Sequence, residues 1–193
     1  MNAEAAQLRT SNLKLQIFSV ALIKSISGIR GTIGGKPGDN LTPVDVVKFA
    51  AAFGTIISKG KDTTKIVIGR DGRISGAMVQ SLVVNTLIGL GIDVVDLGLS
   101  TTPTVEVAVT MEKADGGIIL TASHNPKEWN ALKLLNHEGE FISAEVGANV
   151  LELAANEDFN FGSVDKLGTI TRDESYLQKH IDAILAYPLV NAK

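Results

Sequence analysis

The chain alternates short apolar runs with longer segments whose apolar residues recur at helical spacing. The runs lie at 20–26, 65–69, 92–97 and 116–120, and each of the last three follows a segment with one apolar face. Strands that alternate with helices in this way predict parallel pairing through right-handed crossovers. The sequence therefore predicts an α/β fold in which a mixed, mainly parallel sheet is sandwiched between helices.

Hydroxyl residues are predicted to cap most of the helices, because a side-chain oxygen satisfies an unpaired N–H of the first turn. After the apolar run 131–135, a turn leads into residues 141–142, which predicts a β-hairpin with an antiparallel strand at the sheet edge. The predicted caps are Thr42, Ser75, Thr102 and Ser143, and a last helix spans about 176–186, before Pro188.

The 193 residues, of which 45% are hydrophobic, are enough to bury one domain-sized core. Residues 1–19 are predicted to be disordered or an extra N-terminal segment. Residues 20–156 are predicted to form the α/β domain that carries the candidate serine described below. Residues 157–193 are predicted to be a polar connector and a helix that leads to a second domain.

The net charge of −3 gives the chain no general attraction to nucleic acid or to an anionic membrane surface. Neither partner is predicted, and any anionic ligand must be held by a local group of cations. The absence of cysteine excludes a disulfide framework and a thiolate metal site, which fits a cytoplasmic location. The apolar stretch 12–26 carries charges, is too short to span a bilayer and lacks an Ala-x-Ala-like cleavage site. It is therefore predicted to be neither a signal peptide nor a membrane anchor.

Ser123 follows closely after the apolar run 116–120 and is therefore expected at the carboxyl end of a strand. In an open α/β sheet, ligands bind outside that edge. A hydroxyl next to His124 and before Asn125-Pro126 is a candidate nucleophile or phosphate carrier. The same residue types also form an ordinary turn that ends a strand, and the local sequence leaves both readings open.

Two cations are candidates to hold an anion near this serine. Arg30 lies in a glycine-rich loop at 28–35, where the backbone can approach a ligand closely, although an arginine there can also be a solvated surface charge. Lys133 lies ten positions beyond Ser123 and reaches the serine only if the hairpin doubles back. Asp71 is expected at the same sheet edge, where it either pairs with an arginine, caps a turn or shapes the site.

Several motifs resemble those of the α-D-phosphohexomutases. Residues 121–126 read TASHNP, which is similar to the phosphoserine loop of that family. The resemblance continues in the family's order with SGIRGT at 27–32, GRDGR at 69–73, TTPT at 101–104, and Asn130 with Lys133. It covers about residues 22–185 and implies a sheet of the phosphohexomutase domain I type.

The resemblance implies an isomerase that moves a phosphoryl group between the 1- and 6-positions of a hexose through a bisphosphate. Ser123 would carry the phosphoryl group and supply one ligand to a Mg²⁺ ion. Arg30 and Lys133 would offset the phosphate charge, while His124 would carry a proton or place the loop. Loop support or the rim of the site is expected from Arg70, Asp71, Arg73, Thr121, Asn125 and Asn130.

The departures from the family pattern limit this prediction. The sequence has no DGDxDR-type loop, whose aspartates complete the family's metal site, and it lacks the later loops that bind the sugar and distal phosphate. Many members read Asn-Gly-x-Lys where this chain has Ala131 between its asparagine and lysine. The chain is predicted to be the serine-bearing domain of a phosphohexomutase, inactive without its C-terminal domains, with phosphohexose and hexose bisphosphate as ligands.

Two other functions belong to different classes. One is a non-catalytic phosphosugar-binding or regulatory module. The other is a nucleotide-binding α/β protein, which is disfavoured because neither Gly-x-Gly-x-x-Gly nor Gly-x4-Gly-Lys-Ser/Thr occurs in the sequence. Glucose, mannose and glucosamine phosphates are not distinguished by the residues present.

Overall fold

The structure, a computed structural model, describes residues 21–25 and 28–190 of the chain. The predicted extra segment 1–19 lies outside the described residues. The strands are β1 (Ile23–Ser25), β2 (Gly28–Thr32), β3 (Lys65–Arg70), β4 (Asp93–Leu99), β5 (Gly116–Leu120), β6 (Trp129–Leu135) and β7 (Ile170–Arg172). The helices are α1 (Pro43–Ser58), α2 (Gly76–Gly89), α3 (Thr102–Met111), α4 (Ala144–Asn156) and α5 (Tyr176–Leu185), with a 3-10 turn η1 (Val164–Lys166).

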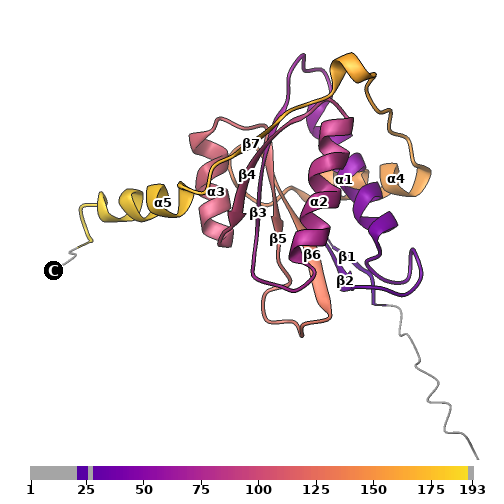
Figure 1. The fold of residues 1–193 in the computed structure, drawn as a ribbon, viewed down its shortest axis with the longest axis horizontal. Helices are drawn as coiled ribbons and strands as arrows, with labels where there is room; N and C mark the ends of the chain where they lie inside the picture. Colours follow the sequence, from indigo (N-terminus) through magenta and orange to yellow (C-terminus); the bar gives the residue numbers. More distant parts are fainter. Residues whose placement is uncertain (1–20, 26–27, 191–193) are drawn as a thin grey trace, which may run out of the picture.

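The strands form one sheet in the order β1-β2-β6-β5-β3-β4-β7 (Figure 1). Strand β3 pairs in parallel with β4 and β5, and β4 pairs in parallel with β7. Strand β6 is antiparallel to both of its neighbours, β2 and β5, and β1 is antiparallel to β2. Consequently β2 runs in the same direction as β3, β4, β5 and β7, and the predicted mixed, mainly parallel sheet is confirmed.

Helices cover both faces of this sheet. Successive side chains of a strand point to opposite faces, so Ile66 and Ile68 of β3 pack in a core with α1, α2 and α4. Val67 points the other way, into a smaller core formed with α3 and the first residue of α5, Tyr176. Figure 1 shows α1, α2 and α4 on one side of the strands and α3 on the other, which is the predicted sandwich.

Two helix caps match the prediction. At the start of α1, the Thr42 hydroxyl accepts a hydrogen bond from the Asp45 N–H, and the Asp45 carboxylate accepts one from the Thr42 N–H at 3.0 Å. At the start of α4, the Ser143 hydroxyl accepts a hydrogen bond from the Val146 N–H at 3.3 Å. Reciprocal bonds of the first kind satisfy two otherwise unpaired N–H groups, so α1 begins where the sequence places it.

Two other predicted caps differ from the structure, α3 in the residue that caps it and α2 in the missing capping bond. Helix α3 is capped by Thr101, whose hydroxyl accepts from the Thr104 N–H, and Thr102 is already helical. Ser75 precedes α2 but has helical backbone angles and makes no capping bond. Its hydroxyl instead accepts a hydrogen bond from the Asn130 side chain at 2.9 Å. A partner 55 residues away therefore takes the oxygen that local sequence assigns to the cap.

Three features of the sheet differ from the sequence prediction. The glycine-rich segment expected to be a loop from residue 28 is strand β2 as far as Thr32. Strand β6, expected at the sheet edge, lies between β2 and β5, because the hairpin of β1 and β2 adds beyond it. The predicted connector at 157–193 contributes β7 to the sheet; its three residues are exposed and have no apolar alternation from which a strand could be recognised.

Helix α5 is attached to the body by its N-terminal half, where His180 Nδ1 lies 3.0 Å from the Thr104 hydroxyl of α3. The buried Tyr176 donates a hydrogen bond from its hydroxyl to the Glu112 carboxylate at 2.6 Å, and the Lys179 ammonium lies over the Tyr176 ring. That hydrogen bond lowers the pKa of Glu112, and burial raises the pKa of Tyr176. The C-terminal half of α5 extends away from the sheet (Figure 1). Within the described part of the chain, none of the helices is long and apolar enough to cross a membrane.

We expect Leu134→Ala to lower the free energy of unfolding by about 2–5 kcal/mol, because Leu134 of β6 is fully buried and its truncation leaves a cavity. Leu99→Ala is the matched control, since Leu99 is 64% exposed on β4 and its truncation should cost less than about 0.5 kcal/mol. Urea unfolding of both variants measures the difference. Equal losses would contradict the interior position of β6.

We expect Asp173 to make the docking of α5 sensitive to acid. Its carboxylate accepts hydrogen bonds from the Lys179 ammonium and from the hydroxyl and N–H of Ser175, which lower its pKa to about 2. Because this pKa is below the ordinary value of about 3.9, the ionised carboxylate stabilises the folded chain at any pH above about 3.9. That stabilisation is lost as the pH falls from there toward about 2. Unfolding measured from about pH 5 to about pH 2 should therefore show a loss that is smaller in Asp173→Asn. An identical pH dependence in the variant would contradict this role.

Candidate functional site

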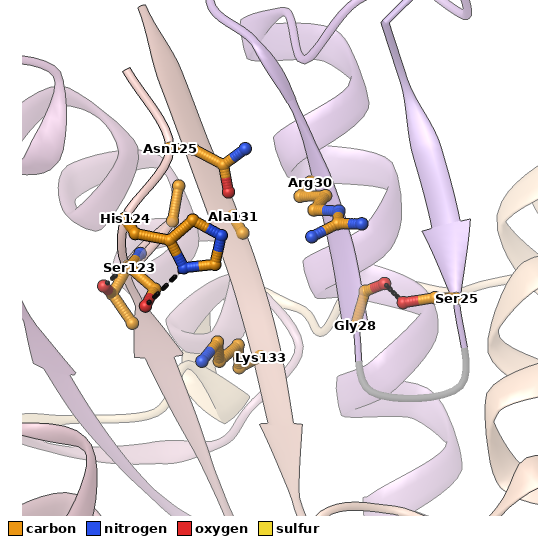
Figure 2. Close-up of a pocket in the computed structure, with 10 residues that line it drawn as sticks. Ser25, Gly28, Arg30, Ser123, His124, Asn125, Ala131 and Lys133 are labelled. Atoms are coloured by element: carbon orange, nitrogen blue, oxygen red, sulfur yellow. Dashed lines mark hydrogen bonds between the residues drawn. The ribbon is translucent and has the colours of Figure 1, made fainter. Parts of the chain in front are cut away.

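A pocket of about 390 Å³ lies between the loop that follows β5 and the strands β2 and β6 (Figure 2). Its volume is within the range of about 300–1,000 Å³ that is usual for small-molecule sites. The residues that line it are Ser25, Gly28, Arg30, Thr121, Ala122, Ser123, His124, Asn125, Ala131 and Lys133. Residues from three separated parts of the chain therefore share one cavity.

Ser123 is exposed in this pocket and has an unusual backbone conformation. Its φ angle is +54°, in the left-handed region that side-chain-bearing residues seldom adopt. The Ser123 N–H donates to the Thr121 hydroxyl oxygen at 3.1 Å, and its own hydroxyl oxygen lies 3.5 Å from His124 Nδ1. Such a conformation costs about 1–3 kcal/mol and persists only where surrounding contacts hold it. The structure thus presents the Ser123 hydroxyl from a fixed loop.

Arg30 and Lys133 both reach the pocket from neighbouring strands. Arg30 of β2 pairs with Ala131 of β6, and Lys133 lies two residues farther along β6, on the same face of the sheet. Gly28 lies beside the Lys133 backbone, so each long cation is opposite a small residue. Figure 2 shows the Lys133 side chain beside Ser123 and His124, whereas Arg30 lies across β6, on β2. Strand β6 does double back beside β5, which is the condition on which the approach of Lys133 depended.

The segment after β3 lies under the serine loop and does not line the pocket. The Asp71 carboxylate accepts hydrogen bonds from the Thr121 hydroxyl at 2.6 Å and from the Arg73 N–H at 3.0 Å. The Arg73 side chain also contacts this carboxylate and donates to backbone carbonyls of the serine loop, including that of Asn125. These residues therefore support the loop without lining the pocket themselves.

Arg70 and Asn130, predicted at the rim, also lie outside the pocket. The Arg70 Nε donates to the Gln80 side chain at 2.8 Å and faces another cavity. Asn130 is fully buried, and its amide bridges the Ser75 hydroxyl and the Ala131 N–H, at 2.9 and 2.8 Å. The Asn130 side chain thereby joins the start of β6 to the loop before α2.

Several residues that line the pocket were not among the predicted site residues. Ala131 alternates with Lys133 along β6, so the two-residue period of a strand would have identified it. Ser25 has no such signal, because it reaches the pocket only through the hairpin of β1 and β2; its hydroxyl donates to the Gly28 carbonyl at 2.9 Å. Ala122 simply precedes the serine.

The described residues include no group of three or more His, Cys, Asp or Glu side chains arranged to hold a metal ion. Ser123, the metal ligand expected from the sequence, has no carboxylate among the residues that line its pocket. The part of the chain that the structure describes therefore does not make up a Mg²⁺ site without further ligands.

The chain is also similar to known proteins over most of its length. The sequence model of the phosphoglucomutase/phosphomannomutase α/β/α domain I matches residues 22–161. The chain belongs to the phosphoglucomutase/phosphomannomutase family, and it corresponds to domain I of that family.

Two relatives support the assignment, and a solved structure shares the fold. A phosphoglucomutase/phosphomannomutase of Thermococcus kodakarensis is 38% identical over 80% of this chain and 34% of its own length. A phosphoglucosamine/phosphogalactosamine mutase of Sulfurisphaera tokodaii is 33% identical over 83% of this chain and 34% of its own length. A family protein from Burkholderia thailandensis shares the fold with a TM-score of 0.68 and 23% identity, over 87% of this chain and 35% of that one. The chain thus spans about a third of the length of these relatives.

We expect Gly28→Ala to be more damaging than Gly38→Ala. Both glycines have positive φ, but a Cβ at Gly28 would lie 2.2 Å from the Leu132 carbonyl oxygen, whereas a Cβ at Gly38 would meet open space. The positive φ should cost each variant about 1–2 kcal/mol, and crowding should cost Gly28→Ala about 1–3 kcal/mol more. Thermal and urea unfolding measure both. Equal costs would show that the close approach of β2 and β6 at the pocket floor is not constrained.

Proposed function

We propose that this chain is the phosphoserine-bearing domain of a phosphohexomutase, which interconverts hexose 1-phosphate and hexose 6-phosphate through a hexose bisphosphate. The observation that carries the proposal is the meeting of the Ser123 hydroxyl with the Arg30 and Lys133 cations around one pocket. These three residues come from separate elements, so their proximity is a property of the fold. Membership of the family and the mutase names of its relatives support the same reaction.

In the proposed reaction, phosphoserine 123 gives its phosphoryl group to a free hydroxyl of the bound hexose monophosphate. The bond between phosphorus and the serine oxygen breaks, a bond to the sugar oxygen forms, and the proton of the sugar hydroxyl ends on the serine oxygen. The resulting bisphosphate then returns its other phosphoryl group to Ser123. The net result moves phosphate between two hydroxyls of one sugar and leaves the serine phosphorylated.

The protein's own contribution to these steps is position and charge. Phosphoryl transfer requires mainly that the reactants are aligned and that the phosphate charge is offset. The Arg30 guanidinium can bind two phosphate oxygens at once, and the Lys133 ammonium adds a point charge. His124 Nδ1, 3.5 Å from the Ser123 oxygen, is close enough to pass on the transferred proton or to orient the serine.

The remaining predictions about the whole protein are part of this proposal. When bound, a Mg²⁺ ion would offset phosphate charge as a Lewis acid, and the phosphate on Ser123 would supply one of its ligands. The other ligands and the sugar-binding loops would come from the C-terminal domains. Glucose, mannose and glucosamine phosphates remain equivalent candidates for the hexose. The location is proposed to be cytoplasmic.

Incubation of the protein isolated from its own cells with a hexose 1,6-bisphosphate tests the proposal. We expect intact-mass analysis to show the gain of one phosphoryl group and peptide mapping to place it on Ser123, because its exposed hydroxyl shares the pocket with both cations. Ser123→Ala should lose both the label and the mutase activity. Ser143→Ala, at the start of α4 and not among the residues that line the pocket, is the matched control and should keep both.

Label on another residue, or mutase activity in Ser123→Ala, would overturn the assignment. A protein that binds the bisphosphate without becoming phosphorylated would indicate the alternative, a non-catalytic phosphosugar-binding module. The 193-residue chain by itself is expected to give no appreciable isomerisation of a hexose 1-phosphate in the presence of Mg²⁺. Robust turnover by it would contradict the dependence on further domains.

A further inference from the structure

The Arg73 guanidinium uses every one of its hydrogen-bond donors on protein atoms around the serine loop. An arginine side chain carries five N–H donors in a planar fork. The acceptors are the Asp71 carboxylate for Nε at 3.2 Å, the Pro126 and Trp129 carbonyls for Nη1 at 2.8 and 3.0 Å, and the Ser123 and Asn125 carbonyls for Nη2 at 2.7 and 2.8 Å. Arg73 thus binds four carbonyls that lie fifty or more residues away in sequence.

This guanidinium is nearly enclosed by the loop that it binds. The side chain of Arg73 is 10% exposed. A charged group and its acceptors withdrawn from water depend on one another, because loss of the donor leaves carbonyls without a partner. Removal of the guanidinium should therefore release the serine loop more than it loosens the sheet.

The contacts of Arg73 fix the peptide groups on both sides of Ser123. Its Nη2 holds the Ser123 carbonyl, while the Ser123 N–H donates to the Thr121 hydroxyl oxygen. That hydroxyl donates to the Asp71 carboxylate, which in turn accepts from the Arg73 Nε. These hydrogen bonds form a closed ring through Ser123 and account for its positive φ angle, a conformation that needs such support.

Arg73 differs in this respect from the two cations of the pocket. Arg30 and Lys133 line the cavity, whereas Arg73 does not, and its five donors are already engaged. An arginine in this state has no N–H left for a phosphate oxygen. Its contribution to a bound phosphoryl group must therefore pass through the loop.

We infer that Arg73 is a positioning residue, which holds the Ser123 hydroxyl in its reactive orientation through the carbonyls of the 121–129 loop. The part of this inference that concerns the reactivity of Ser123 rests on the proposed function. The part that concerns the loop geometry does not. It follows that Arg73 acts on the rate of phosphoryl transfer and not on the binding of the hexose phosphate. Arg73 thus affects the chemistry without contacting the substrate.

Hydrogen exchange of the folded 193-residue chain tests the loop geometry without any ligand. The reporting amides are those of Ser123, Asn125 and Trp129, which are hydrogen-bonded within the loop. In Arg73→Met, which keeps an unbranched chain but no donors, we expect these amides to exchange at least about tenfold faster while those of β5 keep their wild-type rate. Arg73→Lys, with three donors, should lie between and serves as the second variant if Arg73→Met does not fold.

Tyr176→Phe is the control for general loss of stability. It removes the hydrogen bond to Glu112 at the attachment of α5, on the opposite face of the sheet from α1, α2 and α4 and outside the pocket. In Tyr176→Phe, the exchange rate of the serine-loop amides relative to that of the β5 amides should equal the wild-type ratio. Unchanged loop exchange in the Arg73 variants, or equally fast exchange in Tyr176→Phe, would overturn the inference.

Kinetics of the natural protein test the functional consequence. We expect Arg73→Met to slow phosphorylation of Ser123 by a hexose 1,6-bisphosphate about 100-fold, with a change in KM for hexose 1-phosphate below about threefold, since displacement of a reacting group affects the rate first. A loss confined to KM would overturn the inference in favour of direct substrate binding. If the wild type is not phosphorylated at all, the proposed function fails, and the exchange result still decides the loop geometry.

Discussion

The hydrogen bonds from the Arg73 guanidinium to the serine loop connect the loops that follow β3 and β5, two neighbouring parallel strands of the sheet. Four carbonyls of one short turn point toward a single cation that is almost withdrawn from water. An uncompensated cluster of carbonyl dipoles would be unfavourable there, so the turn and the arginine stabilise each other. The orientation of Ser123, and with it the form of the pocket, depends on this interaction.

The sheet provides the rigid base on which this loop rests. Helices cover both faces of the sheet. The antiparallel strand β6 comes directly after the serine loop and returns beside β5, which brings Lys133 of β6 close to that loop. Strand β2 then adds Arg30 from the far side of β6. These three cations thus have different surroundings. Arg73 is hydrogen-bonded to backbone carbonyls, whereas Arg30 and Lys133 line the cavity.

Much of the fold could be predicted from local sequence. The strands at β3, β4 and β5, the helices, and the caps Thr42 and Ser143 follow from signals within a few residues, because strand alternation, helical periodicity and caps are local. Ser123 was found in the same way, from its place after a buried run. The mistaken predictions concern residues whose partners are distant, such as Ser75, whose hydroxyl binds Asn130, and β7, which becomes a strand only by pairing with β4.

The sequence by itself determined the α/β class, the mainly parallel sheet, the loop that carries Ser123 and the identity of the cations that could serve it. Only the tertiary structure decided which of these cations line the pocket. Arg70 binds Gln80 and Arg73 binds carbonyls of the serine loop, while Arg30 and Lys133 line the cavity. The physical reason is that the partners of a charged side chain are the groups that the fold places within hydrogen-bonding distance. Acceptors more than fifty residues away along the chain cannot be predicted from the local pattern of residues.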